Sequence, residues 1–592
     1  MKIKILSSIS IFTAALALHV NAVTLTVTPS VISNNYAGDI TLNITGLTNT
    51  EQVQVQRWID GNANGVIDAG ELMMESFNIA DGGAMVINGV TNLNVPFDSN
   101  SATGAITTTL NFAANMTIEN MVGHFVYAIV SPGGRFAPVT ATFTVTNAAL
   151  NQSISGTIYS NGVPSPYAVV VAQDMQAGNP VASAVADAGG NYFLTLPASS
   201  YGLIGGAPGC YFDQNSVPSF TLTNGVSVTN DLYLTGGTNT ISGSVYDAGN
   251  SNAIVGLLVT IQSGTLFEIA FTDTNGNYSA AVPAGFWKIQ PTKERLARRA
   301  YVLPETAFQV NATGGSVTNA NIALPEGNAL FYGRVTDNSN NPFANVEADG
   351  STDNNTYGAK GYSDLNGYYA VAVLGDLTNY WNCNVNNGKN TAIANYIINT
   401  FNNITNAPNQ VTLQNFIALP ATATISGHVQ SNSGTNIVGV QLFANAVIGG
   451  NNYSTLDAAT DGSGNYSLAV ANGRWDVEFL TGGHDSGNLN VQGYVDLNSP
   501  HFVNIPPTNA VLNLTVYPIG TPVISSPQRF SSTQFGFVIQ GATNVNYTVQ
   551  VSTNLASTNW VNLFSFTPTN NTFPVVDMNA TNSRRFYRVQ EN

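Results

Sequence analysis

The chain of 592 residues is too long for a single hydrophobic core, and at roughly 100 to 150 residues per domain it should form about four to six domains. Only 8% of its residues are charged, where about 25% is usual, so Asn, Ser, Thr and Gly must supply the polar surface. Such residues favour turns and strand surfaces, and the formal net charge of −16 excludes nucleic acid as a natural partner. We therefore expect an all-β protein.

Residues 1–22 have the pattern of a secretory signal peptide. A short basic start precedes an apolar run from Ile5 to Leu18, and the small-residue end Val20-Asn21-Ala22 predicts cleavage before Val23. No later apolar run is long enough to span a bilayer. The sequence thus predicts a secreted, extracellular or cell-surface protein without a transmembrane segment after cleavage.

Residues 23–148 are predicted to form an immunoglobulin-like (Ig-like) β-sandwich. The stretches TLTVTPSVI, DITLNITGL, QVQVQRWI and PVTATFTVT alternate apolar and polar residues as strands do. DGNANGVIDAGE, residues 60–71, follows the third stretch and matches a calcium loop, with ligands at positions 1, 3, 5, 7, 9 and 12 and glycine at 6. The predicted metal ligands are Asp60, Asn62, Asn64, Val66 through its carbonyl, Asp68 and Glu71.

Oxygen ligands of this kind suit Ca²⁺, with an affinity of about 10⁻⁴ to 10⁻³ M for extracellular modules. A plain polar turn is the alternative, because DG and NG pairs are common in hairpins and the preceding residues alternate like a strand, whereas an EF-hand loop follows a helix. A turn does not, however, need acids at both positions 9 and 12. We interpret the loop as a calcium-stabilised turn that stiffens the first domain.

Four domain-sized repeats follow. Each opens with an apolar strand around a glycine, in ISGTI, ISGSV, FYGRV and ISGHV, and these glycines, Gly156, Gly243, Gly333 and Gly427, are 87, 90 and 94 residues apart. The predicted domains are 149–236, 237–326, 327–420 and 421–518, which we call repeats 1 to 4, and a small C-terminal β module at 519–592.

Two further marks recur within the repeats. The first is an Asp-x-x-Gly turn followed by a strand with tyrosine, in DAGGNY, DTNGNY, DLNGYY and DGSGNY; its acids are Asp187, Asp273, Asp364 and Asp461. The second is an aromatic strand with Trp287 or Trp475, and looser counterparts at Tyr201 and Trp381. About seven short strands per repeat argue for a β-sandwich.

These marks resemble the carboxypeptidase-regulatory-like family, a transthyretin-like or prealbumin-like sandwich that often occurs in tandem in secreted bacterial proteins. The resemblance covers roughly residues 150–520 and implies non-catalytic modules in a carbohydrate-binding-like fold group, without specific ligand residues. Collagen-adhesin stalk domains are similar but carry Lys-to-Asn isopeptide bonds. We expect none here, since the lysines after residue 22, Lys288, Lys293, Lys360 and Lys389, lie outside the opening strands of the repeats.

The sequence contains neither of two common catalytic motifs, H-E-x-x-H and G-x-S-x-G. GGHDSG, residues 482–487, is interpreted as a loop, and the acidic turn residues are explained by their turns.

Cys210 and Cys383 could pair, but we favour two buried small residues. Core packing is likewise favoured over sugar stacking for Trp58, Trp287, Trp381, Trp475 and Trp560. The basic cluster TKERLARR, residues 292–299, is expected to be a solvated loop or short helix without a function.

Three functions remain open. The favoured one is a secreted, non-catalytic structural or adhesive scaffold whose repeats act as spacers. The alternatives are a carbohydrate-binding array and an extracellular hydrolase or its accessory region. Extracellular polysaccharide or a cell-surface protein is the expected partner.

Overall fold

The computed structural model describes residues 22–112, 120–175, 180–216, 219–306, 308–385, 391–481, 486–506, 508–519, 522–541, 545–556, 559–570 and 572–591. The predicted signal peptide up to residue 21 and residues 482–485 of GGHDSG lie outside these ranges. The chain divides into two compact units. Unit 1 comprises Met1–Val335, Pro342–Cys383 and Asn402–Asn415, and unit 2 comprises Thr336–Asn341, Asn384–Phe401 and Phe416–Asn592.

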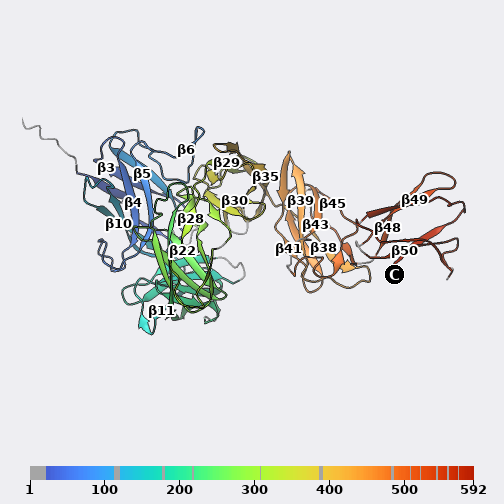
Figure 1. Cartoon of the computed structure of the whole chain (residues 1–592), viewed down its shortest axis with the longest axis horizontal. Coiled ribbons are helices and arrows are strands. Elements are labelled where there is room, and N and C mark those ends of the chain that lie inside the picture. Colours follow the sequence, from blue (N-terminus) through green and yellow to red (C-terminus); the bar gives the residue numbers. More distant parts are fainter. Residues whose placement is uncertain are drawn as a thin grey trace, which may run out of the picture. The chain divides into compact units, whose positions relative to one another are not determined.

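The fold is all-β, as predicted. Helices in the described ranges are limited to α1 (Lys293–Ala297) and the 3₁₀ turns η1 (Gln214–Ser216) and η2 (Thr391–Ile393). None of the helices seen in those ranges is long and apolar enough to cross a membrane. The strands form pairs of sheets around apolar cores, a tandem array of β-sandwiches (Figure 1).

The N-terminal domain packs the sheet β1-β3-β8 against the sheet β2-β10-β9-β4-β5, and carries the hairpin β6-β7. Alternation produces the core: in β3 the apolar Ile40, Leu42 and Ile44 are buried, while the polar residues between them are partly exposed. Its strands are β1 (Thr24–Thr28), β2 (Val31–Ser33), β3 (Asp39–Thr45), β4 (Gln52–Ile59), β5 (Met73–Ala80), β6 (Val86–Ile87), β7 (Val90–Thr91), β8 (Ala105–Asn111), β9 (Gly123–Val130) and β10 (Val139–Thr146).

Repeat 1 has one sheet in the order β14-β13-β16-β18, and a second in which β11 pairs with β12, β15, β19 and β20. Its strands are β11 (Ser153–Ser160), β12 (Val163–Pro164), β13 (Val169–Asp174), β14 (Pro180–Val185), β15 (Asn191–Thr195), β16 (Ser199–Gly206), β17 (Cys210–Asp213), β18 (Phe220–Leu222), β19 (Ser227–Thr229) and β20 (Leu232–Gly236).

Repeat 2 packs the sheet β24-β21-β28 against strands in the order β23-β22-β25-β27. Strand β17 of repeat 1 pairs with β23, so a single sheet continues from repeat 1 into repeat 2. The strands of repeat 2 are β21 (Asn239–Asp247), β22 (Leu258–Ser263), β23 (Leu266–Phe271), β24 (Asn277–Val282), β25 (Phe286–Pro291), β26 (Leu303–Pro304), β27 (Phe308–Asn311) and β28 (Ile322–Leu324).

The residues of predicted repeat 3 are divided between the two units. In unit 1, β29 pairs with β32 and β36, and β31 pairs with β30 and with β26 of repeat 2. In unit 2, β34 pairs with β37. The strands are β29 (Ala329–Asp337), β30 (Glu347–Thr352), β31 (Tyr357–Tyr362), β32 (Tyr368–Val373), β33 (Tyr380–Val385), β34 (Tyr396–Ile398), β35 (Phe401–Thr405), β36 (Val411–Leu413) and β37 (Phe416–Pro420).

Unit 2 also holds repeat 4 and the C-terminal module. Repeat 4 packs β42-β38-β47-β44 against β40-β39-β43-β45, and the C-terminal module has the sheets β48-β49-β52 and β51-β50-β53. The strands are β38 (Ala423–Ser431), β39 (Gln441–Ile448), β40 (Asn451–Ser454), β41 (Ala458–Ala459), β42 (Asn465–Val470), β43 (Gly473–Phe479), β44 (Tyr494–Val495), β45 (His501–Ile505), β46 (Ala510–Val511), β47 (Leu514–Pro518), β48 (Val523–Arg529), β49 (Phe535–Gln540), β50 (Tyr547–Ser552), β51 (Val561–Phe566), β52 (Thr572–Asp577) and β53 (Phe586–Glu591).

Within unit 1 the domains pack against one another. The buried cluster of the N-terminal domain includes Val169 of repeat 1 and Leu258 of repeat 2. The side chain of Asn94 donates to the carbonyl of Ala370 at 2.7 Å and accepts from the backbone N–H of Tyr362 at 2.8 Å, which joins the N-terminal domain to repeat 3. Repeats 1 to 3 therefore contact the N-terminal domain, and the expected role of the repeats as spacers stays a prediction.

The expectation of a solvated basic cluster is wrong. TKERLARR forms the short helix α1 and the turn after it, but Arg295 and Arg298 are buried. The Arg298 Nη1 lies 2.7 Å from Glu75 Oε1 on β5 of the N-terminal domain. Lys360 of repeat 3 reaches Glu294 of α1, with an Nζ–Oε1 distance of 2.7 Å. The cluster is buried because α1 lies where three domains of unit 1 meet.

The cysteines and the repeat tryptophans lie in the cores, as favoured from the sequence. Cys210 and Cys383 are free and buried. Trp287, Trp381 and Trp475 are at most 1% exposed, which confirms packing over sugar contact for these three. Each indole N–H donates to a backbone carbonyl, at Pro283, Leu374 and Ala471 respectively, as the hydroxyl of Tyr201 does to Pro197.

Candidate functional site

The acidic loop 60–71 connects β4 to β5, two antiparallel neighbours, so its flanks are strands as predicted. The loop is closed at its base by the bond from Ile59 N–H to Leu72 O at 3.0 Å. Asp60 and Glu71, the first and twelfth positions, are 2% and 6% exposed. The two ends of the loop are therefore buried, and its middle faces solvent.

The two buried carboxylates hold the backbone of the loop. Asp60 accepts hydrogen bonds from the N–H groups of Asn64 at 3.0 Å and Gly65 at 2.9 Å. Glu71 accepts from Gly61 at 3.1 Å and Asp68 at 2.9 Å. These bonds, together with a positive φ of 75° at Gly65, bend twelve residues into a compact turn.

The three middle ligand candidates converge on one another. The side-chain amides of Asn62 and Asn64 both donate to Asp68 Oδ2 at 2.8 Å, and these bonds lower the pKa of Asp68. The structure thus brings Asn62, Asn64 and Asp68 together, while Asp60 and Glu71 turn toward the backbone. In the part of the chain that is described, no three His, Cys, Asp or Glu side chains gather closely enough to hold a metal ion.

The loop also lies against repeat 1. A Cβ at Gly61 would fall 1.7 Å from the ring of Tyr167, so only glycine allows this approach. A groove of about 310 Å³ between the loop and repeat 1 is lined by Asp60, His124, Asp187 and Asn191, among others. The conformation of the loop is therefore coupled to the contact between two domains of unit 1.

The Asp-x-x-Gly turns have the predicted geometry in all four repeats. Asp461 Oδ1 accepts from the N–H groups of Ser463 and Asn465 at 2.8 Å, and Gly464 has a φ of 80°. The equivalent acids, Asp187, Asp273 and Asp364, accept from the residues two and four positions later in the same way. These carboxylates are thus used in holding turns, as the sequence indicated.

The tyrosine after each turn is buried and fixes the last strand of its repeat. The hydroxyl of Tyr466 donates to the carbonyl of Leu512 at 2.8 Å, and burial raises the pKa of the phenol. The same carbonyl would lie 1.7 Å from a Cβ at Gly427 in the opening strand, which explains the glycine. Tyr192, Tyr278 and Tyr369 donate in the same way to Asn230, Ala320 and Gln414.

One recurrent Asp or Asn position in the repeats was not identified from the sequence. It directly follows the residue whose carbonyl accepts the tyrosine hydroxyl. Its side chain accepts a hydrogen bond from the backbone N–H of the residue after the opening glycine. Asn513 accepts from His428 at 3.0 Å. Asp231, Asn321 and Asn415 accept from Thr157, Ser244 and Arg334. Asp or Asn directly before a closing apolar stretch, as in DLYL and NIAL, is the signal that could have found it.

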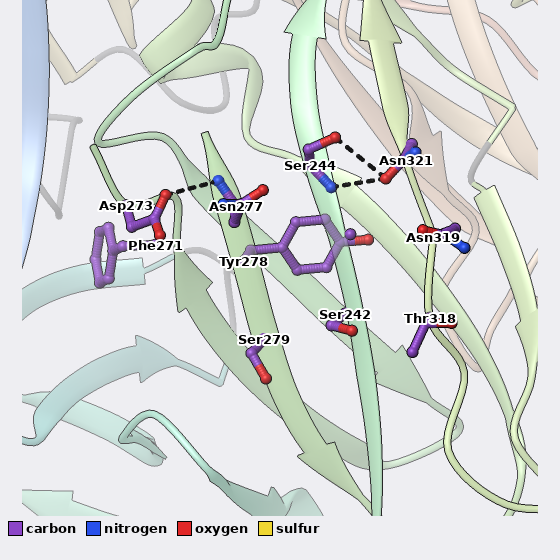
Figure 2. A pocket seen from close by; sticks show the side chains of 11 residues that line it. Ser242, Ser244, Phe271, Asp273, Asn277, Tyr278, Ser279, Thr318, Asn319 and Asn321 are labelled. Atoms are coloured by element: carbon purple, nitrogen blue, oxygen red, sulfur yellow. Dashed lines mark hydrogen bonds between the residues drawn. The ribbon is translucent and has the colours of Figure 1, made fainter. Parts of the chain in front are cut away.

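Repeat 2 carries an open polar groove of about 630 Å³ on the outer face of β21 and β24 (Figure 2). Ser242 and Ser244 of β21 lie between Asn277 and Ser279 on one side and the segment 318–321 on the other (Figure 2). The N–H and hydroxyl of Ser244 both donate to Asn321 Oδ1 (Figure 2). The polar lining could accept or donate hydrogen bonds, but Tyr278 is buried and offers no aromatic face.

No family model matches the chain, and no curated protein matches it. Solved structures do match in part. "The Bacillus anthracis TIE protein" is 14% identical and covers 67% of this chain and 75% of its own, with a TM-score of 0.15. A streptococcal ancillary pilin is 12% identical and covers 47% and 98%, with a TM-score of 0.16. A DUF3823 family protein from Bacteroides ovatus is 14% identical and covers 29% and 90%, with a TM-score of 0.13. Such low TM-scores transfer no function.

Proposed function

We propose that this chain is a secreted, non-catalytic scaffold of the cell surface or extracellular space, built from carboxypeptidase-regulatory-like domains. One observation carries the proposal: the polar residues that recur in every repeat, the turn Asp, the tyrosine and the Asp or Asn of the last strand, all bond to the backbone of their own domain. Recurrent residues in an array of binding or catalytic sites would face a ligand instead. The repetition is thus explained by the architecture.

The alternative of a carbohydrate-binding array has one observation in its favour, the polar groove of repeat 2, where Ser242, Ser279 and Asn319 line an open surface. Sugar recognition commonly combines such hydrogen-bonding groups with an aromatic face. Phe271 at the edge of the groove is half-buried and could supply one.

The experiment that separates these functions uses the purified chain in a glycan array with millimolar calcium, a panel of glycosidase and protease substrates, and protease shaving of intact producing cells. A scaffold gives surface-accessible protein, no hydrolysis and no glycan signal. A glycan signal lost in Ser242→Ala with Asn319→Ala, but kept in Ser426→Ala of repeat 4, would favour the carbohydrate-binding function. Hydrolysis by the pure chain would contradict both.

We also propose that the acidic loop binds Ca²⁺. Rotation of the Asn62 and Asn64 amides would present their oxygens where their nitrogens now meet Asp68, and the loop would then offer the hard oxygen ligands that Ca²⁺ prefers. Asp60 and Glu71 would add carboxylate oxygens from the two ends of the loop. The ion would replace hydrogen bonds within the loop rather than open a helix pair.

Calcium is expected to raise the melting temperature of unit 1. At ten to a hundred times the dissociation constant the stabilisation is about 1 to 3 kcal/mol. Asp60→Asn with Glu71→Gln should remove the increase; each amide keeps one oxygen as an acceptor for a backbone N–H, whereas each carboxylate uses both of its oxygens. Differential scanning calorimetry in calcium and in chelator makes the measurement.

Asp187→Asn, in the turn of repeat 1, is the matched control, because it removes a charge near the loop without touching a predicted ligand. It should keep the full calcium effect. A wild-type melting curve that is the same in calcium and in chelator would contradict the proposal of calcium binding and would not affect the scaffold proposal.

A further inference from the structure

The opening strand of every repeat pairs in parallel with a strand near the end of the same repeat. In repeat 4, Ile425 of β38 lies opposite Ala510 of β46, and Val429 lies opposite Leu514 of β47. The same parallel pairing joins β11 to β19 and β20, β21 to β28, and β29 to β36. In the N-terminal domain, β2 pairs in parallel with the last strand, β10.

This arrangement decides how a domain responds to tension. The chain enters at the start of the opening strand and leaves at the end of the closing strand. Because the two strands are parallel, tension on the two ends pulls them along each other in opposite directions. All hydrogen bonds between them are then loaded together, whereas a hairpin pulled from its open end loses its bonds one at a time.

Side chains add further bonds at the same place. In repeat 4 the N–H of Leu512 donates to Ser426 O at 2.8 Å, and the N–H of His428 donates to the Asn513 side chain at 3.0 Å. Both bonds cross directly between the opening strand and the closing segment. The hydroxyl of Tyr466, on the neighbouring strand β42, donates to the carbonyl of Leu512. Equivalent bonds recur in repeats 1 to 3. In all four repeats, the opening strand is therefore bonded to the closing segment in the same way.

We infer that these domains resist tension, and that the chain is a load-bearing tether between whatever is attached at its two ends. This inference deepens the proposed scaffold function and rests on it for its biological setting. The mechanical property itself belongs to the strand order. We call the pairing of the opening and closing strands, together with the Asp or Asn side chain that crosses between them, the parallel clamp. Its hydrogen bonds would have the mechanical role that isopeptide bonds have in stalk domains.

The C-terminal module provides an internal contrast. Its pairings in the described ranges are all antiparallel: β48 with β49, β49 with β52, β50 with β51 and β50 with β53. It therefore has no parallel clamp in those ranges. We expect it to unfold at a lower force than the repeats.

The test is single-molecule force spectroscopy on the full chain, held by its two ends. Each repeat should extend the chain by about 300 Å, the reach of roughly 90 extended residues. The clamp variant is Asp231→Ala, Asn321→Ala, Asn415→Ala and Asn513→Ala together. It is expected to unfold roughly five-fold faster at a given force, the factor for one net hydrogen bond of about 1 kcal/mol.

The matched control removes the same chemistry from the turns: Asp187→Ala, Asp273→Ala, Asp364→Ala and Asp461→Ala together. Each change takes away a side-chain oxygen that accepts backbone N–H groups, but none crosses the clamp. The control should lower equilibrium stability in urea at least as much as the clamp variant, and leave the unfolding rate under force nearly unchanged.

Two results would overturn the inference: repeats that unfold at forces no higher than the C-terminal module, or equal acceleration in the two fourfold variants. If a fourfold variant does not fold, Asn513→Ala and Asp461→Ala are compared singly, each altering one event in the force trace. Failure here leaves the scaffold proposal intact, because that proposal is tested by glycan binding, hydrolysis and surface exposure. Conversely, hydrolysis by the chain would refute the scaffold and not the clamp.

Discussion

Substitution of Glu75 by Gln is expected to lower the free energy of unfolding of unit 1 by about 3 to 5 kcal/mol, the cost of leaving buried charge without its partner. Glu75 is 3% exposed. Its Oε1 lies 2.7 Å from Arg298 Nη1, and its Oε2 lies 3.8 Å from Arg295 Nη1. Without the carboxylate, two buried guanidinium groups would face an uncharged amide where the N-terminal domain meets repeat 2.

The same ion cluster predicts acid sensitivity. Burial alone would raise the pKa of Glu75, but Arg298, Arg295 and Arg57 together lower it from 4.5 to about 2. Because the pKa is lower in the folded state than in the unfolded state, the stabilisation is fully present above pH 4.5 and is lost as the pH falls toward 2. Its size is about 3 kcal/mol, in agreement with the expected effect of Glu75→Gln.

Urea denaturation followed by tryptophan fluorescence at pH 7 and in acid makes this measurement. Glu51→Gln is the control, because the Glu51–Arg135 pair is more exposed and should be worth about 1 kcal/mol or less. If Glu75→Gln and Glu51→Gln have equal effects, the buried cluster does not hold the two domains together. A Glu75→Gln variant as sensitive to acid as the wild type would contradict the role of this carboxylate.

The elements that could be predicted from the sequence are those set by local chemistry. Asp461 and Gly464 are three residues apart, and one turn uses both, so the pattern alone was sufficient. The opening glycine and the tyrosine also recur in each repeat. Both are required by one backbone carbonyl, Leu512 O in repeat 4, which lies against the glycine and accepts from the tyrosine, and only the structure shows this.

The packing of the domains in unit 1 could not be predicted, because it depends on residues far apart in the sequence. Glu75 and Arg298 are separated by 223 residues. The available signals were a carboxylate within an apolar strand, MMESF, and the basic cluster TKERLARR, in a chain with few charges. The acidic loop shows the opposite case: its residue spacing predicted the turn, but spacing alone does not fix which way the Asn62 and Asn64 amides face.

A second acid within an apolar strand, Glu268 in LFEIAF, leads to a prediction of opposite sign. It is fully buried on β23 of repeat 2. Its Oε1 accepts from Gly209 of repeat 1 at 3.1 Å and from Ala281 of repeat 2 at 3.0 Å. Oε2 is buried without a hydrogen-bond partner in the described residues. Burial raises the pKa of Glu268 to about 8, although the two backbone N–H groups lower it in part.

Because this pKa is higher in the folded state, the unfolded chain releases the proton first as the pH rises. The contribution of Glu268 to stability is therefore greatest below pH 4.5 and decreases through the range from 4.5 to 8, by up to about 5 kcal/mol. Glu268→Gln keeps an oxygen for Gly209 and Ala281 but cannot ionise. The variant should be more stable than the wild type at pH 8, with little dependence on pH between 5 and 8.

The measurement is a series of urea midpoints from pH 5 to 9 for the wild type and Glu268→Gln, a range in which Glu75 is already ionised and contributes no slope. Parallel slopes in the two proteins would show that Glu268 ionises without cost. A steeper slope in the wild type would show instead that a neutral acid joins repeat 1 to repeat 2. Ionisation in alkaline solution would then place a buried, poorly compensated negative charge at the contact between repeat 1 and repeat 2.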